Sequence, residues 1–244
     1  MSPFPIPAPG RDGRSRAVGA DAVFIWLRFG WNLFLVNPVR WLVSMLTLTA
    51  AFIALMYMIG WAVLLLASLL APILSAGLFA MCRKAADEGV FGLSDLAAGL
   101  TTRTAPLIVL GVIYLLAEVL VALAVLLPFT GHMGSATAGL AWIALMAGGV
   151  LVLALLAWLL FIPLCMVMWF APALVLFNGM PPLRACRASF AACLKNILPF
   201  LILGLIVNIL GFFAVLPAGL GYLVLIPVLA GTAYASYQDV FVFH

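Results

Sequence analysis

The sequence predicts an all-α, polytopic membrane protein with six transmembrane helices arranged as three helical hairpins. Of its 244 residues, 68% are hydrophobic and only 7% are charged, whereas a soluble domain carries about 25% charged residues. Three long stretches, 41–82, 104–183 and 196–238, contain no Asp, Glu, Lys or Arg except Glu118. Each stretch is long enough for two spans of about 20 apolar residues. Lipid is therefore the expected solvent of this chain.

The domain organisation is simple. Residues 1–20 are predicted to form a disordered cytoplasmic tail, and residues 21–244 a single membrane-embedded domain. The tail is rich in Pro and Gly, carries three arginines, and lacks the apolar core and cleavage site of a signal peptide.

The six spans are expected at approximate positions that follow the charge-free stretches: 40–59, 62–82, 106–128, 139–162, 198–216 and 220–237. Basic residues prefer the cytoplasmic side of a membrane. With six spans, all 11 Lys and Arg lie on one side, whereas a seventh span within 140–180 would export Arg184, Arg187 and Lys195. The charge pattern therefore favours six spans with both termini in the cytoplasm.

The fourth of these helices is expected to be long. Residues 140–180 contain Pro163 and Pro172, which bend a helix without always ending it. We expect a bent helix that continues to about residue 176, with its end leaving the membrane or lying at its surface.

A short segment of mixed polarity precedes each predicted hairpin and ends at a proline. The segments are RFGWNLFLVNP, LSDLAAGLTTRTAP and RACRASFAACLKNILP, ending at Pro38, Pro106 and Pro199. We interpret them as three repeats of one unit, an interfacial amphipathic helix followed by a hairpin. The alternative is that the likeness reflects only the shared composition of membrane segments.

Two of these lead-in segments carry cations along one helical face. Arg28 shares a polar stripe on the first, and Arg184, Arg187 and Lys195 share a face of the third at i, i+3 and i+11. Such helices lie in the membrane interface with their cations toward anionic headgroups. They either anchor and space the hairpins or form a cytoplasmic docking surface for a partner protein or for lipid headgroups.

The sequence resembles an uncharacterised family of bacterial inner-membrane proteins of about this length, the BPSS-type family. The resemblance is carried by five stretches in order along the chain: FGWNLFLVNPVRW (29–41), PILSAGLFAMCR (72–83), FAPALVLF (170–177), ASFAACLKNILPF (188–200) and YASYQDVF (234–241). It implies a six-span protein of the bacterial inner membrane, and it supplies no catalytic residues.

Groups that could perform catalysis are scarce. The two histidines, His132 and His244, are far apart in the chain, and the four cysteines lack C-x-x-C spacing. No metalloprotease, nucleophile-elbow or phosphate-loop motif is present. We expect no catalytic residue, cofactor or metal, and no nucleic-acid partner.

Two polar groups lie inside predicted spans. Glu118 is about 12 residues into the third span and Asn208 about 10 residues into the fifth, so a rise of 1.5 Å per residue places both near mid-bilayer. A protonated Glu118 would be able to donate a hydrogen bond to the amide oxygen of Asn208. The pair is either a structural hydrogen bond that holds two helices together or a proton- or cation-responsive site beside a cavity. In a third interpretation, Glu118 meets a partner subunit.

The sequence therefore favours a non-catalytic accessory, assembly or scaffold component of the inner membrane. Its expected contacts are the lipid bilayer and either another membrane protein or anionic headgroups. The alternative is a small transporter, flippase or channel that uses the level of Glu118 and Asn208 as its site. An intramembrane enzyme ranks third.

Overall fold

The structure, a computed structural model, describes residues 15–130 and 139–241, together with their side chains except for most of those between 125 and 158. This described part is helical and contains no strand, which confirms the all-α prediction. Its helices are α1 (Ala22–Val36), α2 (Pro38–Ile59), α3 (Ala62–Glu88), α4 (Leu93–Leu96), α5 (Ala98–Thr102), α6 (Thr104–Thr130), α7 (Gly139–Asn178), α8 (Pro182–Lys195), α9 (Ile197–Val215) and α10 (Tyr222–Phe241).

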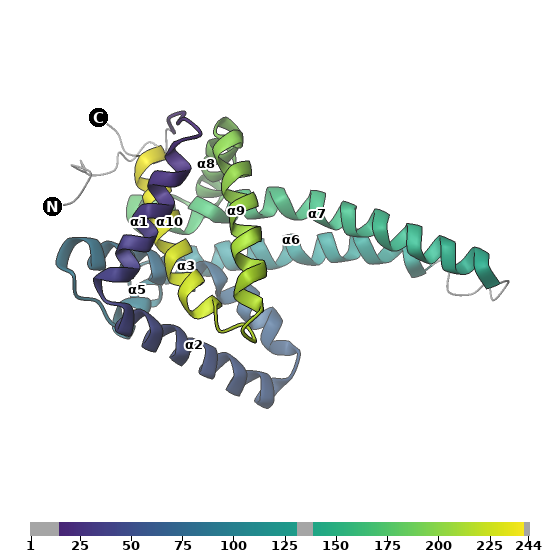
Figure 1. Cartoon of the computed structure of the whole chain (residues 1–244), viewed down its shortest axis with the longest axis horizontal. Helices are drawn as coiled ribbons and strands as arrows, with labels where there is room; N and C mark the ends of the chain where they lie inside the picture. Colours follow the sequence, from purple (N-terminus) through teal and green to yellow (C-terminus); the bar gives the residue numbers. More distant parts are fainter. Residues whose placement is uncertain (1–14, 131–138, 242–244) are drawn as a thin grey trace.

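The long helices form three consecutive pairs that diverge from a common region (Figure 1). The α2–α3 and α9–α10 pairs turn at residues 60–61 and 216–221. In Figure 1 α1, α8 and the end of α10 lie at the upper left, whereas the α2–α3 turn lies at the bottom and α6 and α7 extend together to the far right. We call the common region the base. It comprises residues 15–45, 76–103, 166–196 and 228–241.

Five helical stretches of the described residues are long and apolar enough to cross a membrane. They are Pro38–Ile59, Ala62–Glu88, Thr104–Ala124, Leu159–Asn178 and Ile197–Val215. Four of them match the first, second, third and fifth predicted spans. Together they give the chain the character of a multi-pass membrane protein whose long helices contact lipid.

The fourth predicted span, 139–162, lies mostly outside the residues whose side chains are described, so its bounds stay a prediction. α7 is one uninterrupted helix that contains Pro163 and Pro172, as expected for a helix that continues to about residue 176. The candidate stretch within its described part is Leu159–Asn178. The end of α7, expected to leave the membrane or to lie at its surface, is enclosed by other helices, and residues 170–175 are buried. Enclosure by α3, α8 and α10 explains why this apolar end is not exposed.

α10 corresponds to the sixth predicted span, 220–237, but is not among the five candidate stretches. Its second half carries Thr232, Ser236, Gln238 and Asp239, which lower its mean hydropathy. It is also the most enclosed of the described long helices, with twelve of its 20 residues buried. A helix that faces protein rather than lipid has less need of an apolar surface.

Each lead-in helix ends at one non-helical residue immediately before the next long helix. These joints are Asn37 between α1 and α2, Arg103 between α5 and α6, and Asn196 between α8 and α9, with φ of −154°, −141° and −115°. A proline follows within the first turn each time, where its missing N–H costs no helical hydrogen bond. The three joints therefore share a local geometry, whereas internal repetition of the whole unit stays a prediction.

The second lead-in segment departs from the predicted repeat. It forms two short helices, α4 and α5, rather than one amphipathic helix. Both helices pack closely against the backbone of α3. A Cβ on Gly99 of α5 would lie 2.6 Å from the carbonyl oxygen of Ile73 of α3, and a Cβ on Gly77 of α3 would lie 2.3 Å from the carbonyl oxygen of Leu96 of α4. Such close backbone approach is possible only at glycine.

The first and last helices pack against each other through glycines. A Cβ on Gly30 of α1 would lie 2.3 Å from the carbonyl oxygen of Val228, and one on Gly231 of α10 would lie 2.8 Å from Cα of Gly30. Small residues that let backbones approach are typical of helix contacts in membranes. This contact joins the two ends of the described chain within the base.

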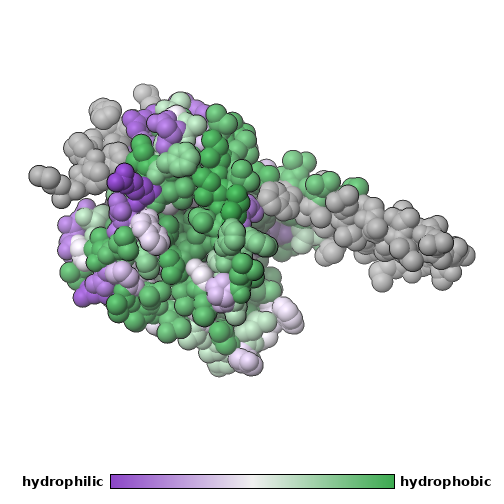
Figure 2. Space-filling model, in the orientation of Figure 1, coloured by the Kyte–Doolittle hydropathy of each residue, from purple (hydrophilic) through white to green (hydrophobic). Residues whose placement is uncertain are grey.

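The outer ends of the pairs have little contact with the rest of the chain. Only 11% of the apolar stretch of α2 and 17% of that of α9 are buried, against 39% for α7. In Figure 2 hydrophobic side chains cover most of α9, whereas the most hydrophilic ones gather at the upper left and along the left edge. The surface is therefore divided between a polar region at the base and apolar outer ends.

Candidate functional site

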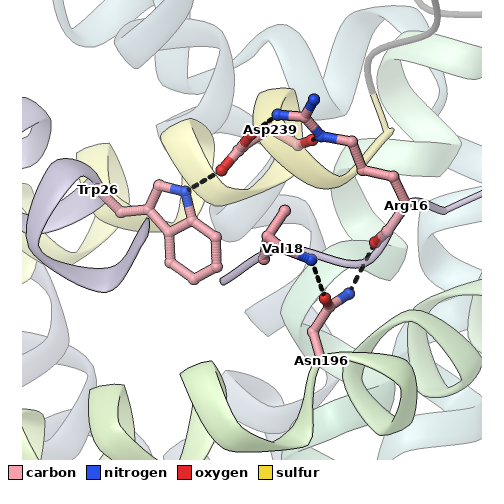
Figure 3. A network of polar contacts seen from close by, with 5 residues as sticks. All are labelled: Arg16, Val18, Trp26, Asn196 and Asp239. Atoms are coloured by element: carbon pink, nitrogen blue, oxygen red, sulfur yellow. Dashed lines mark hydrogen bonds and ion pairs between the residues drawn. The ribbon is translucent and has the colours of Figure 1, made fainter. Parts of the chain in front are cut away.

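A network of polar contacts lies within the base (Figure 3). The Asp239 carboxylate on α10 receives the Arg16 guanidinium on one oxygen and the indole N–H of Trp26 on the other, the latter at 2.8 Å. The Asp239 side chain is 14% exposed and that of Arg16 is 50% exposed. The backbone N–H of Arg16 also donates to the carbonyl of Val240 at 2.9 Å. One carboxylate therefore holds α1 and the segment before it against α10.

Asn196, at the joint between α8 and α9, completes this network and is buried. Its side-chain oxygen accepts the backbone N–H of Val18 at 2.7 Å. Its amide nitrogen donates to the carbonyl oxygens of Arg16 at 3.0 Å and Ala192 at 2.9 Å. Every side-chain polar atom of this buried residue is therefore satisfied, as its burial requires.

Residues 15–18, which we call the N-terminal strap, thus connect the third lead-in helix to the last helix. Lys195 contributes a further contact, donating from Nζ to the carbonyl of Ser15 at 2.6 Å. The strap lies within the stretch 1–20 that composition predicts to be a tail, and this described part of the stretch contacts the fold. Asn196 lies three residues before Pro199, the proline that ends the third lead-in segment, but the sequence did not predict its partners.

The predicted basic face of α8 is exposed at Arg184, Arg187 and Lys195. The opposite face packs on α7, and Ser189 donates to the carbonyl of Met166 at 2.7 Å and accepts the N–H of Phe170 at 3.1 Å. Burial raises the pKa of the Cys193 thiol on this inner face to about 12, so it remains a protonated packing group. α8 is therefore a fixed amphipathic helix with its cations outward.

The cations of the predicted docking face differ in their contacts. Lys195 is held by the strap, whereas Arg28, Arg184 and Arg187 are exposed and have no hydrogen bond or ion pair with the part of the chain that the structure describes. Arg28 lies on α1 and the other two on α8. The structure thus presents two free arginines side by side on α8 and a third on a different helix.

The two residues of the predicted intramembrane pair have different neighbours. On α6, the side chains of Tyr114 and Glu118 are close enough to interact, and Cys165 of α7 is close enough to interact electrostatically with Glu118. Asn208 is exposed on α9 and donates to the carbonyl of Gly204 at 2.8 Å. The structure does not join Glu118 to Asn208 by a hydrogen bond, and a functional role for either stays a prediction.

A second set of polar contacts, which the sequence did not predict, joins α7 to α10. The Tyr237 hydroxyl donates to the side-chain oxygen of Asn178 at 2.6 Å, and the Trp169 indole donates to Ser236 at 3.2 Å. Nothing in the sequence indicated that Trp169 contacts a residue 67 positions away.

Metal-binding groups do not gather within the described residues, where no three His, Cys, Asp or Glu side chains could hold one ion. The four cysteines are free, three of them buried and Cys165 exposed. His132 and His244 lie outside the described residues.

Comparison with known proteins places the chain in a family. No family model matches the chain, and no solved structure matches it. It is 30% identical over 232 residues to a probable inner membrane protein of Burkholderia thailandensis, an alignment that covers 89% of this chain and 82% of that protein. With the apolar helices, this similarity identifies an integral, multi-pass protein of the bacterial inner membrane. The chain belongs to the same family as that probable inner membrane protein.

Proposed function

We propose that this protein is a non-enzymatic assembly or scaffold component that holds other membrane proteins against its long helices. The proposal rests on the difference between the base, whose residues are packed, and the long helices, whose apolar residues are mostly left exposed by the rest of the chain. The buried share of the apolar stretches is 11% in α2, 17% in α6 and 17% in α9. Exposed apolar helix faces in a membrane contact either lipid or the helices of another protein.

The proposed topology has six spans as three hairpins, with the base and both termini on the cytoplasmic side. The five candidate stretches supply five spans, and α10 is the sixth, tolerating its polar residues because other helices enclose it. The described cations of the chain then share one side with the strap. We also propose that the family of this chain is the BPSS-type family, which the five quoted stretches resemble.

Site-specific photo-crosslinking in native membranes tests the assembly function. A photoreactive amino acid is placed at Leu205 of α9, which is 64% exposed, and at Leu203, which is 2% exposed, as the matched control. We expect Leu205 to form an adduct with one defined membrane protein and Leu203 to react only within its own chain. Lipid adducts alone at Leu205, Leu46 of α2 and Leu120 of α6 would rule out the scaffold function.

The second candidate is a small transporter, flippase or channel, which the surroundings of Glu118 favour. Its carboxyl is half-buried and lies beside Tyr114 and Cys165, and an ionisable group at mid-membrane depth commonly marks a transport pathway. Proteoliposomes distinguish the two functions. A proton or cation flux that Glu118→Gln abolishes and Asn208→Ala preserves would favour transport through Glu118, and the absence of any flux would remove this candidate.

A further inference from the structure

The outer face of α8 is divided into an apolar edge and a basic edge. At 100° per residue, Leu183 and Leu194 lie within about 20° of each other, and both are exposed. Arg187, Arg184 and Lys195 follow along the next 100° of the same exposed face. The remaining face is fixed against α7, so α8 cannot rotate to present anything else outward.

The position of this face along the chain relates it to the membrane. After the single joint residue Asn196, the chain enters α9, whose first exposed residues include Ile197 and Leu198. α9 is one of the candidate spans. The C-terminal end of α8 is therefore within one helical turn of an entry into the hydrocarbon layer. At that level lie the phosphates of the lipid headgroups.

No acidic residue of the surrounding sequence neutralises this face. The chain has no Asp or Glu between Glu118 and Asp239, and the two ion pairs of the described residues, Arg16 with Asp239 and Lys84 with Asp95, do not involve α8. Arg184 and Arg187 are one turn apart, a spacing that places their Cβ atoms about 5–6 Å from each other. Two guanidinium groups at that spacing suit the oxygens of one phosphate, which arginine binds in bidentate fashion.

We propose that Arg184 and Arg187 bind the phosphate of an anionic phospholipid in the cytoplasmic leaflet, with Leu183 and Leu194 beside its acyl chains. The order of the two edges favours a lipid over a protein as the ligand of this face. Leu194 on the leucine edge lies just before Ile197 and Leu198, which are exposed on α9, and the arginine edge lies beside the leucine edge on α8. The headgroup and tail of one lipid are arranged side by side in the same way. The proposal rests on the base lying at a membrane surface, but it does not require a protein partner.

Native mass spectrometry of the full-length protein tests this binding. The protein is released from nanodiscs that contain equal amounts of phosphatidylglycerol and phosphatidylcholine, and the ratio of the two lipids retained is measured. We expect Arg184→Gln/Arg187→Gln to lower the retained ratio by about fivefold for each arginine, which is the usual contribution of one basic residue at an anionic surface. Raising the salt concentration should reduce the preference of the unaltered protein.

A charge-matched control separates a site from general attraction. Arg28→Gln on α1 removes another exposed arginine, which forms no ion pair with the described residues, and it should leave the lipid ratio unchanged. Arg187→Gln alone is compared with Arg28→Gln if the double variant elutes as an aggregate. Equal losses in Arg28→Gln and Arg187→Gln, or an unchanged ratio in the α8 variants, would overturn the proposal.

Two further outcomes would also overturn it. Displacement of phosphatidylglycerol by water-soluble glycerol phosphate would show a site for free phosphate, because a lipid site should also need Leu183 and Leu194. Loss of a bound acidic protein in the double variant, with phosphatidylglycerol retained, would show that α8 binds protein. Failure of the crosslinking at Leu205 would leave the lipid site intact, so the two proposals fall separately.

Discussion

The base and the outer ends of this molecule are stabilised in different ways. In the base, Trp26, Phe170 and Asn196 are almost fully buried, and buried polar atoms have partners. At the outer ends, Tyr57 is 88% exposed and Phe212 is 65% exposed. The base is therefore held by its own contacts, as a soluble core is, whereas the outer ends depend on their surroundings for apolar contact.

This difference shows where a membrane chain needs specific polar contacts. A long helix satisfies its own backbone and can lie in lipid without a neighbour. A joint such as Asn196 interrupts the helix and exposes backbone groups that require partners. The strap, the joints and Asp239 all lie in the base, so substitutions there and at the outer ends should have unequal effects.

The largest effect is expected at the contact between α1 and α10. Gly30→Ala places a methyl group 2.3 Å from a backbone oxygen and should lower the free energy of unfolding by about 3 kcal/mol. The matched control is Gly204→Ala, whose added Cβ would meet nothing within 4 Å. Denaturant unfolding in detergent micelles measures both. Equal behaviour of the two variants would show that α1 and α10 do not pack as described.

A pair of neighbouring residues on α2 compares the base with an outer face directly. Met45 is 3% exposed and Leu46 is 59% exposed. Met45→Ala should cost about 2 kcal/mol through a cavity, whereas Leu46→Ala should cost under about 0.5 kcal/mol. Thermal unfolding in nanodiscs tests the pair. A large loss for Leu46→Ala would mean that another protein or a second copy covers this face.

The joints differ among themselves in the number of hydrogen bonds that they make. Asn196→Ala leaves the Val18 N–H without its acceptor and should cost about 2 kcal/mol. Asn37→Ala removes only a helix cap to the Arg40 N–H and should cost about 1 kcal/mol. Limited proteolysis is a second measurement, because only the Asn196 variant should expose the strap to cleavage. Cleavage in neither variant would argue against a role for Asn196 in holding the strap.

The smallest effect is expected for Asp239→Asn. The amide oxygen still accepts the Trp26 N–H, but the ion pair with the half-exposed Arg16 is lost, so the cost should be about 1 kcal/mol and should diminish at high salt. Asp21→Asn, an exposed position without a side-chain cap bond, serves as the control. Unfolding at low and high salt is the measurement. Salt-independent loss would indicate that the hydrogen bonds, not the charge, are important.

Much of the fold was predictable because its signals are local. Charge-free stretches placed four spans, and the prolines at 38, 106 and 199 placed the joints within a few residues. The second lead-in segment was less predictable, since Gly77 and Gly99 act through contact with α3 and not through local propensity. The enclosed end of α7 was not predictable either, because an apolar run has the same composition in lipid and in a protein core.

The polar contacts were the least predictable part. Asn196 binds Arg16 and Val18, which precede it by about 180 positions, so no local pattern relates them. For Glu118 the sequence suggested Asn208 on another helix by depth alone. In the structure the neighbour of Glu118 is instead Tyr114, one turn earlier on the same helix. The i, i+4 spacing of the two residues already allowed their side chains to meet. Depth restricts which residues can meet, but the packing of helices decides which of them do.

The glycine contact between α1 and α10 has a consequence for the synthesis of the protein. About 200 residues separate Gly30 from Gly231. At translation rates of roughly 5–20 residues per second, α1 therefore waits roughly 10–40 s for the helix on which it packs. During that interval Trp26, which is buried in the finished fold, lacks the Asp239 carboxylate of α10 that accepts its indole N–H. We expect the nascent α1 to lie on the membrane surface until the last helix arrives.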